Sequence, residues 1–171
     1  KAIADAIAFK KYEFDCHGVE MNQRYQSDAV VSDGTPEPEF TMDGELHYHP
    51  TTWPGARLPH VWVFAEDGSK ASTLDLCGQG RFTVFTGIGG DCWQDAASAV
   101  ADELGIDIVV HKIGPRQPWQ DFTGDWSRHR EIRDGGVLLV RPDQHVAWRA
   151  DGASDDAAAQ LRSALLQVLA K

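Results

Sequence analysis

The clearest hydrophobic pattern in the chain is a pair of apolar runs near its C-terminal end. Residues 137–140 are all apolar, and residues 146–148 form a second run after the turn sequence Arg-Pro-Asp-Gln. Pro142 presets the backbone angle φ that the first central position of a turn requires. A strand with one exposed face would alternate apolar and polar residues, so this pattern predicts a β-hairpin whose first strand is covered on both faces.

An amphipathic helix is predicted after the hairpin. Ser154 can serve as its N-cap, and the two carboxylates that follow suit the positive end of a helix dipole. Apolar residues then recur at helical spacing, at Ala158, Leu161, Leu165 and Val168. This helix is expected to cover one face of the hairpin.

The middle of the chain predicts a strand, a helix and a second strand. Residues 82–86 and 106–110 form the two strands. Asp91 is expected to cap the helix between them, and Gly105 to end it. The apolar stripe of this helix consists of Trp93, Ala97, Val100 and Leu104. A crossover of this length joins parallel strands, so the segment predicts a right-handed βαβ unit.

Together these elements predict an α/β fold of the thioredoxin-like type. Two parallel strands lie at the centre of a mixed sheet, the antiparallel hairpin lies at one edge, and helices cover both faces. A helix at residues 1 to about 14 and an extended arm at residues 15–59 are expected to precede this sheet.

The N-terminal helix needs a surface to pack against. Its apolar positions Ile3, Ile7 and Phe14 cannot stabilise so short a helix in isolation. No capping residue precedes it, which indicates a chain cut from a longer one.

The arm is rich in proline and glycine, and only residues 19–21 and 29–31 could pair as strands. So long an irregular segment is either disordered or laid over a neighbour. Its aromatic content favours the second alternative, because disordered segments contain few aromatic residues.

Composition and charge restrict the classes of function. A chain of 171 residues with 42% apolar residues supports one globular domain, or one domain plus an arm. The net charge of −10 argues against binding to nucleic acid or to an anionic membrane surface. With no membrane-spanning run and no signal peptide, a cytoplasmic location is expected. Three widely spaced cysteines, Cys16, Cys77 and Cys92, predict reduced thiols.

Cys92 is the candidate redox residue of a thioredoxin-like fold. It lies at the start of the predicted central helix, where the helix dipole stabilises a thiolate. Disulfide exchange also requires a second cysteine three residues on, and that position is Asp95. We therefore interpret Cys92 as a small residue at a helix start. A stand-alone thiol redox protein that uses Cys92 is the alternative.

Three histidines could contribute to a metal site. His47 and His49 would point to one face of an extended segment, and His60 follows nearby. Only two of these ligands have a useful spacing, and the neighbouring carboxylates follow no pattern. Solvated or hydrogen-bonded histidines are therefore favoured, and no metal is assigned.

Residues 87–90, Gly-Ile-Gly-Gly, partly match a dinucleotide-binding loop. The last glycine of that motif would have to be Cys92, and no acidic residue follows a second strand as the motif requires. We interpret the loop as a chain turn. No nucleophile elbow accompanies a Ser/His/Asp order. The sequence therefore assigns no catalytic, cofactor-binding or metal-binding residue.

Five stretches nevertheless resemble the phenol hydroxylase family of FAD-dependent aromatic monooxygenases. Residues 54–62 (PGARLPHVW) and 137–149 (VLLVRPDQHVAWR) resemble its C-terminal domain. Residues 18–25 and 29–34 resemble the segment that joins the flavin and substrate core to that domain. Residues 45–52 (ELHYHPTT) resemble the branch that hydroxylates chlorophenols.

The resemblance implies a non-catalytic accessory domain with a thioredoxin-like fold and no redox cysteine pair. Residues 1–59 would be the end of a flavin-domain helix and a connecting arm, and residues 60–171 the domain itself. The parent enzyme would ortho-hydroxylate a phenol with FAD, NADPH and O2, and the flavin would perform that chemistry. The partners implied are the flavin and substrate domain of the same chain and further copies of the enzyme. The family's two flavin motifs do not occur here, so no cofactor is expected in these 171 residues.

Overall fold

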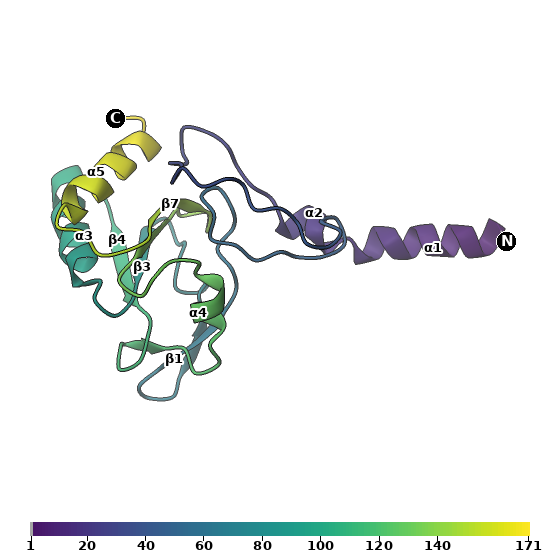
Figure 1. The fold of residues 1–171 in the computed structure, drawn as a ribbon, viewed down its shortest axis with the longest axis horizontal. Helices are drawn as coiled ribbons and strands as arrows, with labels where there is room; N and C mark the ends of the chain where they lie inside the picture. Colours follow the sequence, from purple (N-terminus) through teal and green to yellow (C-terminus); the bar gives the residue numbers. More distant parts are fainter. Residues whose placement is uncertain (1) are drawn as a thin grey trace.

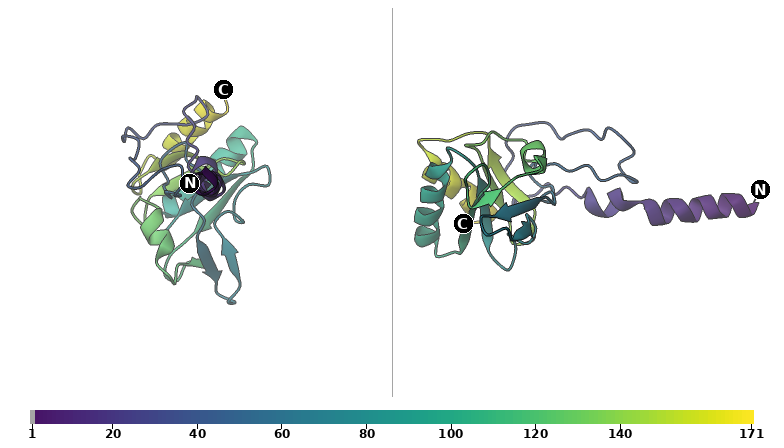
Figure 2. Two further views of the ribbon diagram at one scale, coloured as in Figure 1. Left: turned by 90° about the vertical axis from the view of Figure 1, so that its right-hand side faces the viewer. Right: turned by 90° about the horizontal axis from the view of Figure 1, so that it is seen from below.

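The computed structural model describes residues 2–171 as a layered body from which an N-terminal helix projects (Figure 1). Two further views show the same projection, from along the helix and from below the body (Figure 2). The elements in chain order are α1 (Ala2–Asp15), α2 (His17–Met21), β1 (Trp62–Ala65), β2 (Lys70–Ser72), β3 (Phe82–Thr86), α3 (Asp91–Leu104), β4 (Ile108–Lys112), β5 (Trp119–Gln120), α4 (Asp125–His129), β6 (Val137–Val140), β7 (Val146–Ala150) and α5 (Ala157–Val168).

The main sheet has the strand order β4-β3-β6-β7. β3 and β4 are parallel, and β6 pairs antiparallel with both β3 and β7. The hairpin turn closes where the N–H of Gln144 donates to the carbonyl of Arg141 at 2.9 Å, with Pro142 at the first central position. The predicted thioredoxin-like mixed sheet and its hairpin are confirmed. The parallel pair is not central as predicted, because β4 lies at the edge of the sheet and only β3 and β6 are inner strands.

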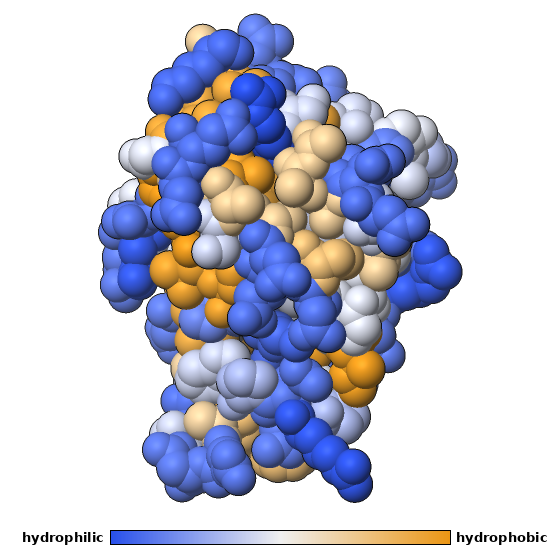
Figure 3. Space-filling view, turned by 90° about the vertical axis from the view of Figure 1, so that its left-hand side faces the viewer, coloured by the Kyte–Doolittle hydropathy of each residue, from blue (hydrophilic) through white to orange (hydrophobic). Residues whose placement is uncertain are grey.

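Helices α3 and α5 cover one face of this sheet and bury its largest cluster of apolar side chains. Trp93 of α3 and Trp148 of β7 meet edge to face, with ring centroids 5.7 Å apart. The outer surface of this side of the molecule mixes small apolar patches with polar side chains (Figure 3). The two helices therefore shield this face of the sheet from solvent with their apolar sides, as amphipathic helices do.

The opposite face is covered by α4 and by a second sheet of order β2-β1-β5. The Trp126 ring of α4 lies 5.5 Å from the Phe85 ring of β3, and Val63 of β1 is fully buried in the same cluster. Val140 is also fully buried here, as the all-apolar run at residues 137–140 predicts. Helices thus lie on both faces of the main sheet. On the second face, the small sheet lies beside the short helix α4.

Both predicted helix starts in the body need correction. Gly90, not Asp91, is the N-cap residue of α3, and Asp91 forms an ion pair with Lys112 instead. The N-cap residue of α5 is Asp156, and Ser154 accepts a hydrogen bond from its N–H at 3.1 Å. Helix α5 therefore starts two residues later than predicted.

One core position, one strand boundary and two predicted strands also need correction. The start of α5 turns Ala157 to the core and leaves Ala158 exposed. The strand predicted at residues 106–110 is β4, which begins at Ile108. Residues 19–21 belong to α2, and residues 29–31 form no strand, so both predicted strand patches of the arm are wrong.

The C-terminal end of the arm lies over the body. Its backbone follows the hairpin, because the N–H of Gly55 donates to Val146 and the N–H of Leu58 donates to Gln144, both at 2.8 Å. Val31 makes one further backbone bond, to Ala147 at 2.7 Å. Among residues 2–171, no helix is long and apolar enough to cross a membrane.

Candidate functional site

The start of α3 is where thioredoxin-like redox chemistry would be placed. Cys92 lies in its first turn, half-buried against the α3 and α5 core, and Asp95 occupies the position of a second cysteine. Cys16, Cys77 and Cys92 are all free. Burial raises the pKa of Cys77 to about 11, although nearby Arg57 opposes the shift, so its thiolate is disfavoured. Nothing in this arrangement favours a thiol redox function.

The glycine loop between β3 and α3 does not fit a dinucleotide. A Cβ atom at Gly90 would lie 1.9 Å from the hydroxyl oxygen of Thr86. A Cβ atom at Gly87 would lie 2.6 Å from the carbonyl oxygen of Asp134. These glycines permit close packing within the protein itself rather than the approach of a phosphate. The flavin implied by the resemblance therefore has no fitting cradle in this loop.

The three candidate histidines are not brought together as metal ligands. His47 is exposed, and the ring of His49 packs 4.9 Å from that of Phe40. His60 shares a hydrogen bond with Ser72 at 2.6 Å and lies edge-on to Trp62. Over the described residues 2–171, no group of three or more His, Cys, Asp or Glu side chains is placed to hold a metal ion.

A polar cluster joins the arm to the body. Arg149 at the end of β7 is only 10% exposed, and its Nε donates to Asp33 of the arm at 2.5 Å. Its Nη1 donates to Glu131, in the loop after α4, at 2.9 Å. Glu131 in turn accepts hydrogen bonds from the arm at Thr51 and Thr52. The cluster ties two arm segments to the body.

Sequence reasoning missed this cluster because its members lie far apart in the chain. Asp33 and Arg149 are separated by 116 residues. The one local signal is the arginine that interrupts the apolar run of the second hairpin strand. A charged side chain on a buried strand requires a partner, but the sequence does not indicate which carboxylate supplies it.

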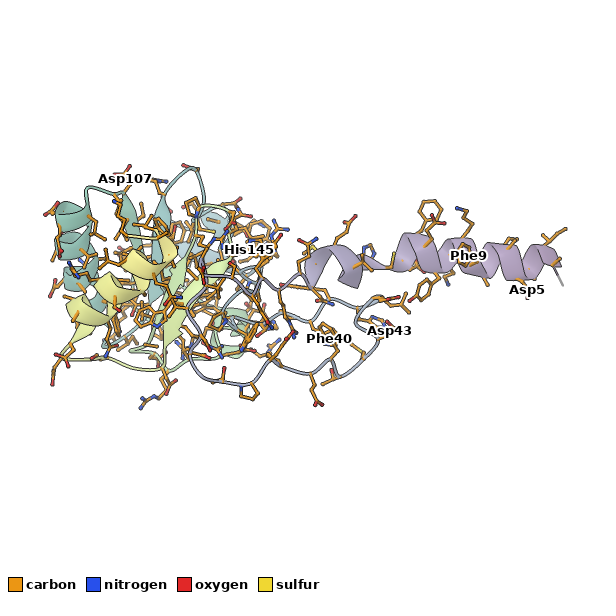
Figure 4. The ribbon with its side chains drawn as sticks, turned by 90° about the horizontal axis from the view of Figure 1, so that it is seen from above. Asp5, Phe9, Phe40, Asp43, Asp107 and His145 are labelled. Atoms are coloured by element: carbon orange, nitrogen blue, oxygen red, sulfur yellow. The ribbon has the colours of Figure 1, made fainter. Side chains whose placement is uncertain are left out.

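A second candidate feature is the exposed apolar surface of the N-terminal part. α1 buries none of its residues, and it projects from the body together with the loop that carries Phe40 and Asp43 (Figure 4). The exposed large apolar side chains within residues 2–42 are Ile3, Ile7, Phe9, Tyr12, Phe14, Val19, Tyr25, Phe40 and Met42. So much exposed apolar area is typical of a contact surface.

Comparison with known proteins gives the family. Residues 51–171 match the profile of the family "Aromatic-ring hydroxylase, C-terminal". The chain is 52% identical over 170 residues to a 2,4-dichlorophenol 6-monooxygenase of Cupriavidus pinatubonensis (strain JMP 134 / LMG 1197), covering 99% of this chain and 28% of the relative. It is 49% identical over 149 residues to a phenol 2-monooxygenase of Pseudomonas sp. (strain EST1001), covering 87% and 24%.

Solved structures agree with this assignment. The crystal structure of the flavin-dependent monooxygenase PieE in complex with FAD and substrate is 46% identical, with a TM-score of 0.84, over 91% of this chain and 26% of that one. The chain therefore belongs to the aromatic-ring hydroxylase C-terminal domain family. It spans 28% of the length of each of two 2,4-dichlorophenol 6-monooxygenases that it matches. The predicted resemblance to phenol and chlorophenol hydroxylases is confirmed.

Proposed function

We propose that this chain is the C-terminal accessory domain of an FAD- and NADPH-dependent monooxygenase that ortho-hydroxylates a phenol or chlorophenol. The observation that carries the proposal is the identity of 52% to a 2,4-dichlorophenol 6-monooxygenase over almost the whole chain. Because the chain matches only 28% of that enzyme, the flavin and the aromatic substrate are assigned to the remaining part.

In this proposal the flavin performs the oxidation, and the accessory domain contributes contacts. The division of the chain follows the sequence: residues 1–59 are the end of a flavin-domain helix and the connecting arm, and residues 60–171 are the accessory domain. The enzyme is a homo-oligomer. The domain has no catalytic residue of its own, which is consistent with the glycine loop that packs against its own backbone.

The distribution of apolar residues around α1 supports a buried position in the complete enzyme. Ile3, Ile7 and Phe14 share one side of the helix by their spacing, whereas Phe9 and Tyr12 lie toward the opposite side. A helix that is apolar on opposite sides is typical of one enclosed within a larger protein. We assign the flavin and substrate domain as the partner that encloses it.

A direct test is to titrate the 171-residue chain with FAD and to follow flavin fluorescence. No saturable binding is expected, and no phenol-dependent oxidation of NADPH, because Gly87 and Gly90 of the β3–α3 loop pack against atoms of the protein itself. The same titration of a complete relative is the positive control. Stoichiometric binding at micromolar FAD would contradict the proposal.

A further inference from the structure

One largely buried side chain, that of Arg149, joins two segments of the arm to the body. We infer that Arg149 is a positioning residue that fixes the path of the arm. Together with Asp33 and Glu131 it forms a group of three charged side chains, which we term the arm clamp. The clamp connects segments that the sequence places far apart, and it includes no residue assigned a role in the proposed reaction.

The first arm segment is held through Asp33. Its carboxylate accepts from Arg149 Nε at 2.5 Å, and from the N–H and hydroxyl of Thr35 at 2.9 and 2.6 Å. Burial opposes ionisation of Asp33, but the bonds from Thr35 and Arg149 outweigh it and keep its pKa below the ordinary value. Asp33 is therefore a charged partner of Arg149 at neutral pH.

The second arm segment is held through Glu131. One oxygen of this carboxylate accepts from the hydroxyl of Thr51 at 2.8 Å, from the N–H of Thr52 at 3.0 Å and from Arg149 at 2.9 Å. The backbone of Glu131 has φ of 54°, in the left-handed region that residues other than glycine seldom adopt. Such a conformation persists where its surroundings hold it, and the converging bonds do so here.

The geometry of Arg149 explains why this residue can define a path. Its guanidinium is planar and donates from Nε and Nη1 in fixed directions, so the two carboxylates can occupy only set positions around it. A buried ion pair adds little net stability, because desolvation offsets the attraction. The ion pairs of Arg149 instead fix the position of Asp33 relative to Glu131.

The other polar contacts between arm residues 22–50 and the body pair no two charged side chains. Nη1 of Arg141 reaches the carbonyl of Ala29 at 3.4 Å, and Nε2 of Gln167 reaches the carbonyl of Val30 at 3.3 Å. The N–H of Val31 donates to the backbone carbonyl of Ala147 at 2.7 Å. The clamp is the one place where charged groups of the arm and the body meet among the described residues.

The consequence for the enzyme rests on the proposed function. The same arm carries Phe40 and Met42, which are exposed here. A clamp that fixes the arm also fixes where these side chains meet the flavin and substrate domain. The clamp itself is a property of the 171-residue chain, so it can be tested without that domain.

Amide hydrogen exchange measured by NMR on the 171-residue chain tests the clamp. Asp33→Asn should raise exchange at Val31 and Thr35 about tenfold and leave Thr52 unchanged, because Glu131 still holds Thr52. Glu131→Gln should raise exchange at Thr52 and leave Val31 and Thr35 unchanged. Arg149→Gln should raise exchange at all three amides, and Arg149→Lys should recover part of the protection.

The matched control is Arg133→Gln, which removes the exposed ion pair with Asp151 close to the clamp and should change none of the three amides. Amides of Val84 and Leu139 in the main sheet report global unfolding. Unchanged exchange in the arm, or equal increases in arm and sheet, would overturn the inference. Neither result would bear on the flavin, so failure here is distinct from failure of the proposed function.

Discussion

His111 joins three elements of the body through its two ring nitrogens. Trp119 of β5 donates its indole N–H to Nδ1 at 3.2 Å, so Nε2 carries the proton and faces the carbonyl of Leu76 at 2.9 Å. The ring also packs 5.6 Å from that of Phe85. A neutral imidazole satisfies both hydrogen bonds, whereas a protonated one would place its Nδ1 proton against the indole N–H.

This geometry predicts that acid destabilises the protein through His111. Burial lowers the pKa of His111 below its ordinary 6.5, and Arg81 adds to the effect, although the bond to Leu76 opposes it. The unfolded chain then binds the proton more readily, so the stabilising contribution is complete above pH 6.5 and is lost as pH falls through the folded pKa. Urea unfolding between pH 5 and pH 8 should show this loss.

The matched variants for this prediction are His111→Gln and His47→Gln, since His47 is exposed. The first should flatten the dependence of the unfolding free energy on pH, and the second should leave it as in the wild type. An identical slope in the wild type and His111→Gln would show that His111 titrates alike in both states.

At the scale of elements, strong local periodicity gave correct predictions and short elements did not. The hairpin and the βαβ unit are long apolar runs with turn residues between them, so neighbouring residues determine them. The small sheet was missed because β5 has two residues and its pairing with β1 joins segments more than 50 residues apart. Val19 suggested a strand in the arm, yet it lies in α2.

The N-cap residues of α3 and α5 were also not predicted correctly from the sequence. Asp91 and Ser154 are both good N-cap residues, but neither occupies the cap. Asp91 forms an ion pair with Lys112, the last residue of β4. Ser154 accepts a hydrogen bond from the N–H of Asp156, the residue that does occupy the cap. Asp91 thus has a tertiary partner, which no alternating or helical pattern encodes, whereas the bond of Ser154 is local and lies just before the helix.

The strand β6 is the stability centre of the body. Val140 is fully buried between the two layers and lies at an irregularity in the pairing of β6 with β7. Val140→Asp should therefore lower the unfolding free energy by several kcal/mol, from a total of about 5–15 kcal/mol for a domain, because no partner can compensate the buried carboxylate.

Thermal and urea unfolding, followed by tryptophan fluorescence, would measure this loss. Ile88→Asp is the control, because Ile88 is 44% exposed and its replacement should change stability little. Equal stability of Val140→Asp and the wild type would place the core strand elsewhere and would contradict the sheet topology.

At the scale of the whole molecule, the candidate surface could be predicted only in part. The sequence indicated that Ile3, Ile7 and Phe14 need a partner, and the structure leaves all three exposed. It gave no indication of the arm clamp, because charge pairs between distant segments have no sequence period. The same limit applies to Phe40 and Met42, whose exposure depends on the path of the arm.

The whole molecule is accordingly a layered body that presents an apolar N-terminal part. The family match at residues 51–171 covers the body and the end of the arm, and the projecting part carries most of the large apolar side chains that are exposed. In the proposed function this domain contributes through its contacts. Its function should therefore be measurable only when the remaining part of the enzyme is present.

The most direct measurement replaces the matching segment of the Cupriavidus pinatubonensis 2,4-dichlorophenol 6-monooxygenase with this chain. We predict a chimera that retains bound FAD and oxidises NADPH in response to dichlorophenol within about tenfold of the parent, since differences spread over 52% identical domains usually add as small terms. The same chimera carrying Val140→Asp should lose its subunit association before it loses FAD, because the flavin is assigned to the remaining part of the enzyme. A folded chimera that binds no FAD, or that binds FAD without dichlorophenol-dependent turnover, would contradict the assignment of this chain as the accessory domain of such an enzyme.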